Sequence, residues 1–257
     1  MNQPDWKLVW ITGGGTGIGR SMALALSESG ASVIISGRTE SALQSVADES
    51  LARHHSGRII PLVLDVTDLE AVKQAVEQME IEHGELDLAL LCAGNHHSMP
   101  VDRFSAATCR ELMEINYFGV MHALEALLPR MLARDKGVLG VVASVAGYRG
   151  LPTAAAYGGS KAALINACEA LATELRATGV HLSLINPGFV RTPLTDKNPF
   201  PMPFLMEADD AAKAIFRGLQ RKQFEIAFPW TFVLQLKIMR LLPYSVYLPL
   251  IRKVTGF

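Results

Sequence analysis

The sequence has few charged residues and few cysteines, and both shortages narrow its possible functions. Charged residues make up 19% of the 257-residue chain, and 24 Lys and Arg residues nearly balance 25 Asp and Glu residues. This balance leaves no electrostatic footprint for nucleic acid, which we exclude as a partner. Cys92, Cys109 and Cys168 lack Cys-x-x-Cys or Cys/His spacing, so the sequence indicates neither a metal site nor a disulfide framework. A reducing, cytoplasmic compartment is the simpler interpretation.

Long uninterrupted apolar runs are also missing. The run before the first glycines has only a few residues, too short for a signal peptide or a spanning helix. Residues 228–251 are strongly apolar, but Pro243, Pro249 and basic residues interrupt them, so they lack the ~20 apolar residues that a spanning helix needs. We expect two apolar helices there, near 230–242 and 244–254. Contact with a membrane interface, packing on the domain or a second subunit, and a lid over the site all remain open for them.

Apolar residues are abundant, at 49% of the chain, and they alternate in a regular order. Short β-rich runs alternate with longer helical patterns, which predicts parallel strands joined by crossover helices. We therefore expect an α/β fold with a Rossmann-like, doubly wound parallel sheet in three layers (residues 1–228) and an apolar C-terminal extension (229–257). The expected strands are 7–12, 32–37, 59–65, 86–94, 138–144, 181–188 and 224–229, and the expected helices are 17–30, 40–53, 69–84, 107–135, 154–179 and 207–222.

Glycines follow the first expected strand in the segment "TGGGTGIG". Gly13, Gly17 and Gly19 would let the backbone turn sharply and approach a pyrophosphate, whose charge would lie at the N-terminus of the next helix. An ordinary tight turn would also explain a glycine cluster, but its position after the first strand favours a nucleotide site. Gly37 closes the second strand where many dinucleotide-binding folds place an acidic residue, and Arg38 follows it.

A tyrosine and a lysine lie one helical turn apart. Tyr157 and Lys161 are four residues apart in a helical stretch and so share one face. A nearby ammonium favours the phenolate of a tyrosine, whose ordinary pKa of about 10 makes it a poor base at neutral pH. Ser144 ends a strand, where its hydroxyl would stabilise charge on a substrate oxygen. Taken singly, each residue also has a purely structural explanation.

Seven motifs in order resemble those of the short-chain dehydrogenase/reductase family. The resemblance runs from about Lys7 to the loop after Asn186, and the wide TGxxxGxG spacing is similar to that of the compact, single-domain branch. The motifs are "TGGGTGIG", "LDVTD", "CAGN", "EINYFG", "VVASVAG", "YGGSK" and "NPGFVRTP". Cys92 departs from the asparagine common in the family at that position.

The resemblance implies a nicotinamide cofactor. Arg38 implies NADP(H), with NAD less favoured, because a guanidinium pairs well with a 2′-phosphate. Arg20 is a second candidate for the phosphate, and a solvated role serves it equally well. By resemblance Asp65 contacts adenine and Thr192 the carboxamide. The implied cofactor residues are Gly13, Gly15, Thr16, Gly17, Ile18, Gly19, Arg38, Asp65, Val66, Ala93, Gly94, Tyr157, Lys161, Pro187, Gly188, Val190 and Thr192.

The resemblance also implies a reaction, which is hydride transfer between the nicotinamide and a ketone or secondary alcohol. Tyr157 would be the acid/base, Lys161 would lower its pKa and bind ribose hydroxyls, and Ser144 would bond the substrate oxygen. Asn116 would kink its helix and hold a water that connects to the lysine. His96 and His97 follow "CAGN", and either the mouth of the substrate site or a solvated loop suits them.

The expected substrate is a hydrophobic, lipid-like carbonyl compound or alcohol. Within the loop at about 187–207, the stretch "NPFPMPFLM" has hardly any charge and contains Phe200, Met202, Phe204, Leu205 and Met206. A small soluble carbonyl is the alternative, and an NADP-binding scaffold with a partner-binding tail is the alternative of another class. Family resemblance implies a homodimer or homotetramer formed through the helices that carry Asn116 and Tyr157.

Overall fold

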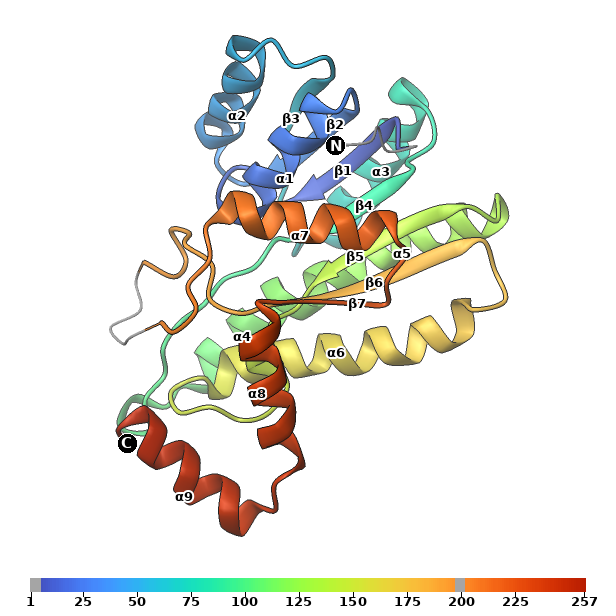
Figure 1. Cartoon of the computed structure of the whole chain (residues 1–257). Helices are drawn as coiled ribbons and strands as arrows, with labels where there is room; N and C mark the ends of the chain where they lie inside the picture. The colour runs from blue at the N-terminus through green and yellow to red at the C-terminus, as the bar shows by residue number, and fades with distance from the viewer. Residues whose placement is uncertain (1–5, 197–201) are drawn as a thin grey trace.

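The structure is a computed structural model that describes residues 6–196 and 202–257. Within these residues, seven parallel strands form one sheet in the order β3-β2-β1-β4-β5-β6-β7 (Figure 1). The order of the strands reverses between β1 and β4, at the kind of switch point where open α/β sheets bind ligands. The strands are β1 (Leu8–Thr12), β2 (Ser32–Gly37), β3 (Arg58–Val63), β4 (Leu88–Leu91), β5 (Gly137–Val142), β6 (Val180–Pro187) and β7 (Glu225–Phe228).

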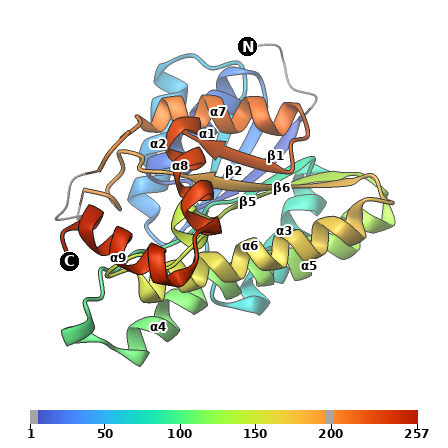
Figure 2. The same cartoon turned by 60° about the horizontal axis from the view of Figure 1, so that its bottom comes forward.

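Helices cover both faces of this sheet, as Figures 1 and 2 show. Buried side chains of α1, α2 and α7 form one core with the sheet, and those of α3, α5 and α6 form the other. The predicted three-layer, doubly wound fold is therefore confirmed. The helices are α1 (Gly17–Glu28), α2 (Glu40–Ala52), α3 (Leu69–His83), α4 (Ala106–Met113), α5 (Gly119–Ala133), α6 (Ala155–Leu175), α7 (Ala208–Gln220), α8 (Trp230–Leu241) and α9 (Tyr244–Thr255).

Strand β1 shows how the sequence builds both cores. Leu8 and Trp10 belong to the core with α3, α5 and α6, whereas Val9 and Ile11 belong to the opposite core. This split follows from the two-residue period of a strand, and a strand covered on both faces has to be apolar at every position. The indole N–H of Trp10 donates to Oγ of Ser36 on β2 at 3.0 Å, which satisfies its one polar atom.

The single helix expected over 107–135 has an irregular middle. Helix α4 ends at Met113, a π-helical turn spans Glu114–Phe118, and α5 begins at Gly119. Such wide turns interrupt the regular hydrogen-bond ladder and occur often at functional sites. Asn116 lies in the wide turn, where the sequence resemblance implies a kink.

The two expected C-terminal helices are α8 and α9. Helix α8 follows β7, and in both views the last turns of α9 lie beside the segment that joins β4 to α4 (Figures 1 and 2). Among the residues that the structure describes, no helix combines the length and the hydropathy needed to cross a bilayer.

Candidate active site

The turn between β1 and α1 brings backbone atoms to the carboxyl edge of the sheet. Gly13 and Gly17 have φ angles of +67° and +53°, in the left-handed region that favours glycine. A Cβ atom on Gly13 would lie 2.8 Å from the Cα of Ala93, so a larger residue does not fit there. Helix α1 begins at Gly17, which places its unpaired N-terminal N–H groups at this edge.

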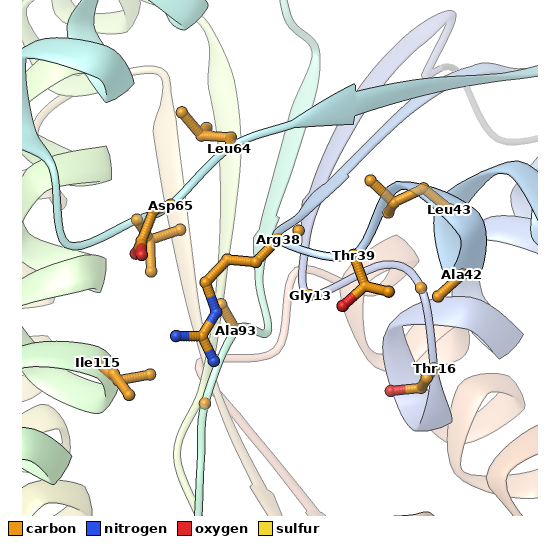
Figure 3. Close-up of a pocket in the computed structure, with 14 residues that line it drawn as sticks. Gly13, Thr16, Arg38, Thr39, Ala42, Leu43, Leu64, Asp65, Ala93 and Ile115 are labelled. Atoms are coloured by element: carbon orange, nitrogen blue, oxygen red, sulfur yellow. The ribbon is translucent and has the colours of Figure 1, made fainter.

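A cavity of about 210 Å³ lies at the carboxyl ends of β1, β2 and β3 (Figure 3). In Figure 3 the side chain of Arg38 extends across it, with Asp65 and Ile115 on one side and Thr16 and Thr39 on the other. Within the described residues, the Arg38 guanidinium has no hydrogen-bond or salt-bridge partner. The lining of this cavity includes eight expected cofactor residues: Gly13, Gly15, Thr16, Arg38, Asp65, Val66, Ala93 and Gly94.

Asp65 is held as a carboxylate at the end of this cavity. Burial alone would raise its pKa, but the Thr67 backbone N–H (3.0 Å), the Thr67 hydroxyl (2.8 Å) and the charge of Arg38 lower it overall. Arg20, the second candidate for a phosphate contact, forms an ion pair with Glu49 of α2 and does not line the cavity. Arg38 is therefore the arginine available to an anion here.

A second cavity of about 190 Å³ adjoins the first, because Gly13, Thr16 and Gly94 line both. The two cavities together extend from Arg38 to Tyr157. The lining of the second cavity includes further expected residues from the turn, the reactive group and the loop after β6: Gly17, Ile18, Ser144, Tyr157, Lys161, Pro187, Gly188, Val190 and Thr192.

Gly19 and Asn116 are the two expected site residues that line neither cavity. A Cβ atom on Gly19 would lie 2.3 Å from the carbonyl oxygen of Gly13, so glycine is needed there for close packing of α1 on the turn. Asn116 is fully buried behind the cavities. Both residues support the site from behind.

Tyr157 lies in the first turn of α6, and Ser144 follows β5. In the protein alone, burial raises the pKa of Tyr157, and a hydrogen bond with Ser144 lowers it only in part. The Lys161 ammonium lies 5.9 Å from the centroid of the Tyr157 ring. The expected lowering of the Tyr157 pKa by Lys161 stays a prediction, because in the protein alone burial has the larger effect on this pKa. Burial therefore favours the protonated phenol in the protein alone.

Lys161 lines the second cavity, and burial destabilises the charged form of its side chain. Only 4% of the residue is exposed, and its Nζ donates to the carbonyl oxygen of Val142 at 2.9 Å. Burial lowers the pKa of Lys161 to about 8, although the neighbouring Cys92 acts in the opposite direction. The ammonium is thus charged at neutral pH but loses its proton far more easily than a surface lysine does.

Asn116 joins the loop after β4 to α6. Its Oδ1 accepts from the backbone N–H of Asn95 (2.7 Å), and its Nδ2 donates to the carbonyl of Asn95 (3.0 Å) and to Oγ of Ser160 (2.9 Å). The Ser160 hydroxyl donates in turn to the carbonyl of Tyr157 at 2.8 Å. Gly94 fits closely against this group, since a Cβ atom there would lie 3.1 Å from Asn116 Oδ1. The network fixes Asn116 relative to the backbone of Tyr157.

Sequence reasoning did not single out two buried hydroxyls that hold the site together. One is Ser160, which lies inside the "YGGSK" motif. The other is Thr12, whose Oγ1 accepts the backbone N–H groups of both Cys92 and Ala93 at 3.0 Å. The sequence feature that could have identified Thr12 is its position directly before the glycines. This contact ties the end of β1 to the loop after β4.

The two histidines after "CAGN" have different surroundings. The ring of His96 meets the ring of Tyr157 edge-on, with 4.8 Å between centroids and an interplanar angle of 84°. Burial, with a smaller effect of His97, lowers the pKa of His96, so its ring is neutral at neutral pH. His97 is exposed beside Glu111. Of the two, only His96 lies against a reactive residue.

Helix α8 approaches the site through aromatic contacts. Phe232 stacks on Phe189 (5.6 Å) and on Phe204 (5.7 Å), and its Cδ1 would lie 3.0 Å from a Cβ atom on Gly188. Met206 pairs with Val190 in a short bridge between the two ends of the loop. Phe200, another residue expected to line the loop, lies outside the described residues.

A half-buried carboxylate connects the loop after Ser144 with β7 and α8. Glu225 accepts hydrogen bonds from the Tyr148 hydroxyl (2.5 Å) and from Nδ2 of Asn186 (3.0 Å), and it also pairs with Lys237. Burial would raise its pKa, but these three partners lower it overall. The C-terminal helices are thus attached to the same loop that carries Ser144.

Comparison with known proteins places these features in a family. A sequence model of the family described as "short chain dehydrogenase" matches residues 7–200. An uncharacterized oxidoreductase from Myxococcus xanthus is 36% identical over 247 residues, which cover 96% of this chain and 97% of that protein. An uncharacterized oxidoreductase from Staphylococcus saprophyticus is 30% identical over 215 residues, 84% of this chain and 92% of that protein.

Solved structures show the same fold. A short-chain dehydrogenase/reductase from Burkholderia phymatum in complex with NAD superposes with a TM-score of 0.84 at 24% identity, over 93% of this chain and 94% of that one. A short-chain dehydrogenase from Streptomyces avermitilis superposes with a TM-score of 0.81 at 24% identity, over 98% of both chains. At this identity the likeness concerns the fold alone.

Proposed function

This chain belongs to the short-chain dehydrogenase family, and from that premise we propose that it is an NADPH-dependent oxidoreductase that interconverts an apolar ketone and its secondary alcohol. The observation that carries the proposal is that Ser144, Tyr157 and Lys161 line one cavity, which adjoins the glycine turn. A protein that only senses the cofactor has no need of a buried proton donor beside a lysine, so the arrangement favours an enzyme over an NADP-binding scaffold.

The residues present fit a dinucleotide. Two adjoining cavities share the glycine turn, and Gly13 admits no side chain that would fill the space between them. Arg38 supports NADPH over NADH, since its guanidinium is unpaired within the described residues and Gly37 stands where an acidic residue would bind the ribose. Asp65 would contact the adenine, and Thr192 the carboxamide. When bound, NADPH supplies the hydride for reduction.

The chain's own residues manage the proton. In the direction of reduction, Tyr157 donates its phenolic proton to the substrate oxygen, and in the reverse direction it is the general base. Its raised pKa keeps the phenol protonated at neutral pH. Ser144 donates a hydrogen bond to the same oxygen, and the Lys161 ammonium stabilises the phenolate that remains and binds ribose hydroxyls.

Asn116 supports the return of the proton to Tyr157. We propose that a water bound beside Asn116 connects Lys161 to solvent, and that Gly94, which has no Cβ atom, leaves the space beside the two side chains free. A Cβ atom on Gly94 would lie 3.1 Å from Asn116 Oδ1 and 3.6 Å from Lys161 Nζ. This closeness supports a role for Asn116 next to the lysine.

The stack of Phe189, Phe204 and Phe232 supports an apolar substrate, because it places aromatic side chains next to Gly188, which lines the second cavity. A small soluble carbonyl compound is the alternative with the same chemistry. We propose further that the enzyme works in the cytoplasm as a homodimer or homotetramer. The free thiols of its three cysteines are consistent with a reducing compartment.

NADPH consumption against unbranched ketones of increasing chain length tests the proposal. We expect kcat/KM to rise by up to about fourfold per added methylene until the site is filled, and to be higher with NADPH than with NADH. A preference for short, polar ketones would replace the apolar substrate by the small soluble one. NADPH binding without turnover of any ketone, and with no difference between the native chain and Tyr157→Phe, would favour the scaffold.

A further inference from the structure

Helix α8 presents apolar side chains on two opposite faces. Val233 and Leu236 are buried in the core, on one side of the helix. On the other side, Trp230, Leu234, Ile238 and Leu241 recur at helical spacing and are exposed, by 70%, 46%, 55% and 84%. A contiguous exposed apolar stripe of this kind is normally an interaction surface. We therefore expect another molecule or surface to cover the outer face of α8.

The exposed apolar surface continues onto α9. Tyr244 and Leu248, one turn apart, are 73% and 58% exposed. Across the described residues, the last 28 positions contain nine of the eighteen large apolar side chains that are exposed. We call Trp230, Leu234, Ile238, Leu241, Tyr244 and Leu248 the C-terminal apolar face. Half of the exposed apolar side chains lie in about a tenth of the chain, which marks an interaction surface.

Charge distinguishes the possible occupants of this face. Four of the chain's 24 basic residues and none of its 25 acidic residues lie in 229–257, so the rest of the chain has 20 basic against 25 acidic residues. The basic four are Lys237, Arg240, Arg252 and Lys253, and all four are exposed. Among the described residues, Lys237 pairs with Glu225, and Arg252 donates from Nε to the main-chain oxygen of Phe257 at 2.7 Å, whereas Arg240 and Lys253 have no acidic partner.

These charges argue against a second copy of the chain. A symmetric contact would bring the same patch from both copies together, and with it two sets of unpaired cations. A lid over the site is also excluded for this face, because Phe232 and Val233 already lie on the site and core side of α8, and the exposed face points away from them. Anionic headgroups above an apolar layer complement both the cations and the apolar side chains.

We propose that the C-terminal apolar face binds the surface of a bilayer that contains anionic phospholipids. Leu234, Ile238 and Leu241 enter the boundary of the acyl chains, and Trp230 and Tyr244 lie at headgroup level, where amphipathic rings are favoured. Arg240, Arg252 and Lys253 pair with the headgroups. Neither helix spans the bilayer, and the attachment is peripheral and reversible.

Contacts with the rest of the domain fix the position of the C-terminal apolar face. The Tyr247 hydroxyl donates to the carbonyl of Gly150 at 2.7 Å, and Ile251, one turn later, is buried as well. These contacts attach helix α9 to the loop that follows Ser144, so the helix pair loses little freedom when it binds. The inference concerns attachment alone and does not depend on the proposed reaction.

Flotation of the full-length chain with vesicles tests the proposal. We expect it to float with vesicles of equal parts phosphatidylcholine and phosphatidylglycerol, to remain behind with phosphatidylcholine alone, and to be released by about 1 M NaCl, where charges are screened. Leu234→Gln, Ile238→Gln and Leu241→Gln together should lower binding at least tenfold. The matched control is Leu51→Gln, Ile81→Gln and Leu132→Gln, which changes three equally exposed apolar residues on α2, α3 and α5 and should leave binding unchanged.

A second pair of variants tests the charges. Arg240→Gln, Arg252→Gln and Lys253→Gln together should lower binding by about tenfold or more. Arg110→Gln, Arg176→Gln and Arg221→Gln remove the same charge elsewhere and should have little effect. Circular dichroism and thermal melting check that all variants fold.

Tryptophan fluorescence identifies the part that enters the lipid. Vesicles with brominated acyl chains should quench the native chain, and Trp230→Phe should remove the quenching because Trp6 and Trp10 lie in the body of the domain. The proposal fails if the native chain does not float with anionic vesicles, or if the apolar triple variant floats as well as its control. It also fails if light scattering shows a dimer that this variant disrupts, since the face would then be a subunit interface.

Discussion

The guanidinium of Arg149 lies over the ring of Tyr247, 3.9 Å from its centroid. The same side chain donates from Nη1 to the carbonyl oxygens of Met239 (2.6 Å), Arg240 (2.9 Å) and Leu242 (2.7 Å), where the last turn of α8 leaves carbonyls without partners. Arg149 belongs to the loop between Ser144 and α6. One side chain thus caps α8, holds α9 and attaches both helices to a loop of the site.

Arg149→Ala should release the C-terminal helices from this loop. Three hydrogen bonds from a charged donor and a cation–π contact are lost, and we expect the free energy of unfolding to fall by about 2 kcal/mol. Trypsin should cleave faster after Lys237, Arg240, Arg252 and Lys253. Arg149→Lys keeps the charge but not the planar fork, so its stability and its rate of cleavage should lie between those of the native chain and Arg149→Ala. Arg110→Ala is the control, and equal cleavage of both alanine variants would contradict the role of Arg149.

Arg149 also marks the limit of what the sequence predicts. The layers of the fold were predictable because strands buried on both faces are apolar throughout, as β1 is, and because only glycine suits the conformation of Gly13. Arg149 contacts a carbonyl 90 residues away, and no local pattern connects them. Such a contact depends on how finished elements pack against each other.

For the reactive residues, too, the sequence predicted some features and not others. Spacing alone placed Tyr157 and Lys161 on one helical face, and motif order associated them with Ser144. Spacing did not predict that burial raises the pKa of Tyr157 in the protein alone, since this depends on how the finished fold surrounds the hydroxyl. Likewise, the family resemblance drew attention to Asn116, but the sequence did not predict its bond with Ser160, which joins two helical segments.

Tyr157→Phe should remove turnover and keep cofactor binding. Phenylalanine preserves the ring that packs edge-on against His96 but has no proton to donate. We expect kcat to fall by at least about 10³-fold, the upper range for a general acid, and the Kd for NADPH, measured by fluorescence titration, to stay within a factor of about two of the native value. Residual turnover above a tenth of the native rate would refute the assignment.

Arg38→Ala should lower the affinity for NADPH and leave that for NADH nearly unchanged. A hydrogen bond to a charged group contributes about 1.5–3 kcal/mol, so the Kd for NADPH should rise by roughly 10- to 100-fold. Arg20→Ala is the matched control, because Arg20 is already paired with Glu49. Isothermal titration of both cofactors against both variants measures the difference. An equal loss for NADH and NADPH would mean that Arg38 does not read the 2′-phosphate.

Lys161 should make both stability and activity depend on pH. Its pKa is lowered to about 8 in the fold and lies near 10.4 in an unfolded chain, so the unfolded state binds more protons between these values. Stability should therefore rise as pH increases from about 8 to 10, as the buried ammonium is neutralised. The kcat/KM for reduction should fall over the same range, because the ammonium that supports Tyr157 disappears.

Lys161→Met separates this effect from other titrations. The variant should have no such rise in stability with pH, and at pH 7 it should be more stable by about 1–2 kcal/mol, after allowance for the lost bond to the carbonyl of Val142. Urea unfolding at several pH values measures both. If Lys161→Met were less stable than the native chain at pH 7, burial would not be the cause of the lowered pKa.

Ser160→Ala should slow the reaction without weakening cofactor binding. Ser160 touches neither cavity, but it accepts from Asn116 and donates to the carbonyl of Tyr157, so its loss lets both residues shift. We expect kcat to fall about tenfold, equivalent to one hydrogen bond, with the KM for ketone and the Kd for NADPH little changed. Ser183→Ala is the matched control, because Ser183 is equally buried and its hydroxyl also donates to a backbone carbonyl, that of Gln223. Both variants should lose similar stability, but only Ser160→Ala should lose kcat, and equal kcat values would leave Ser160 a purely structural residue.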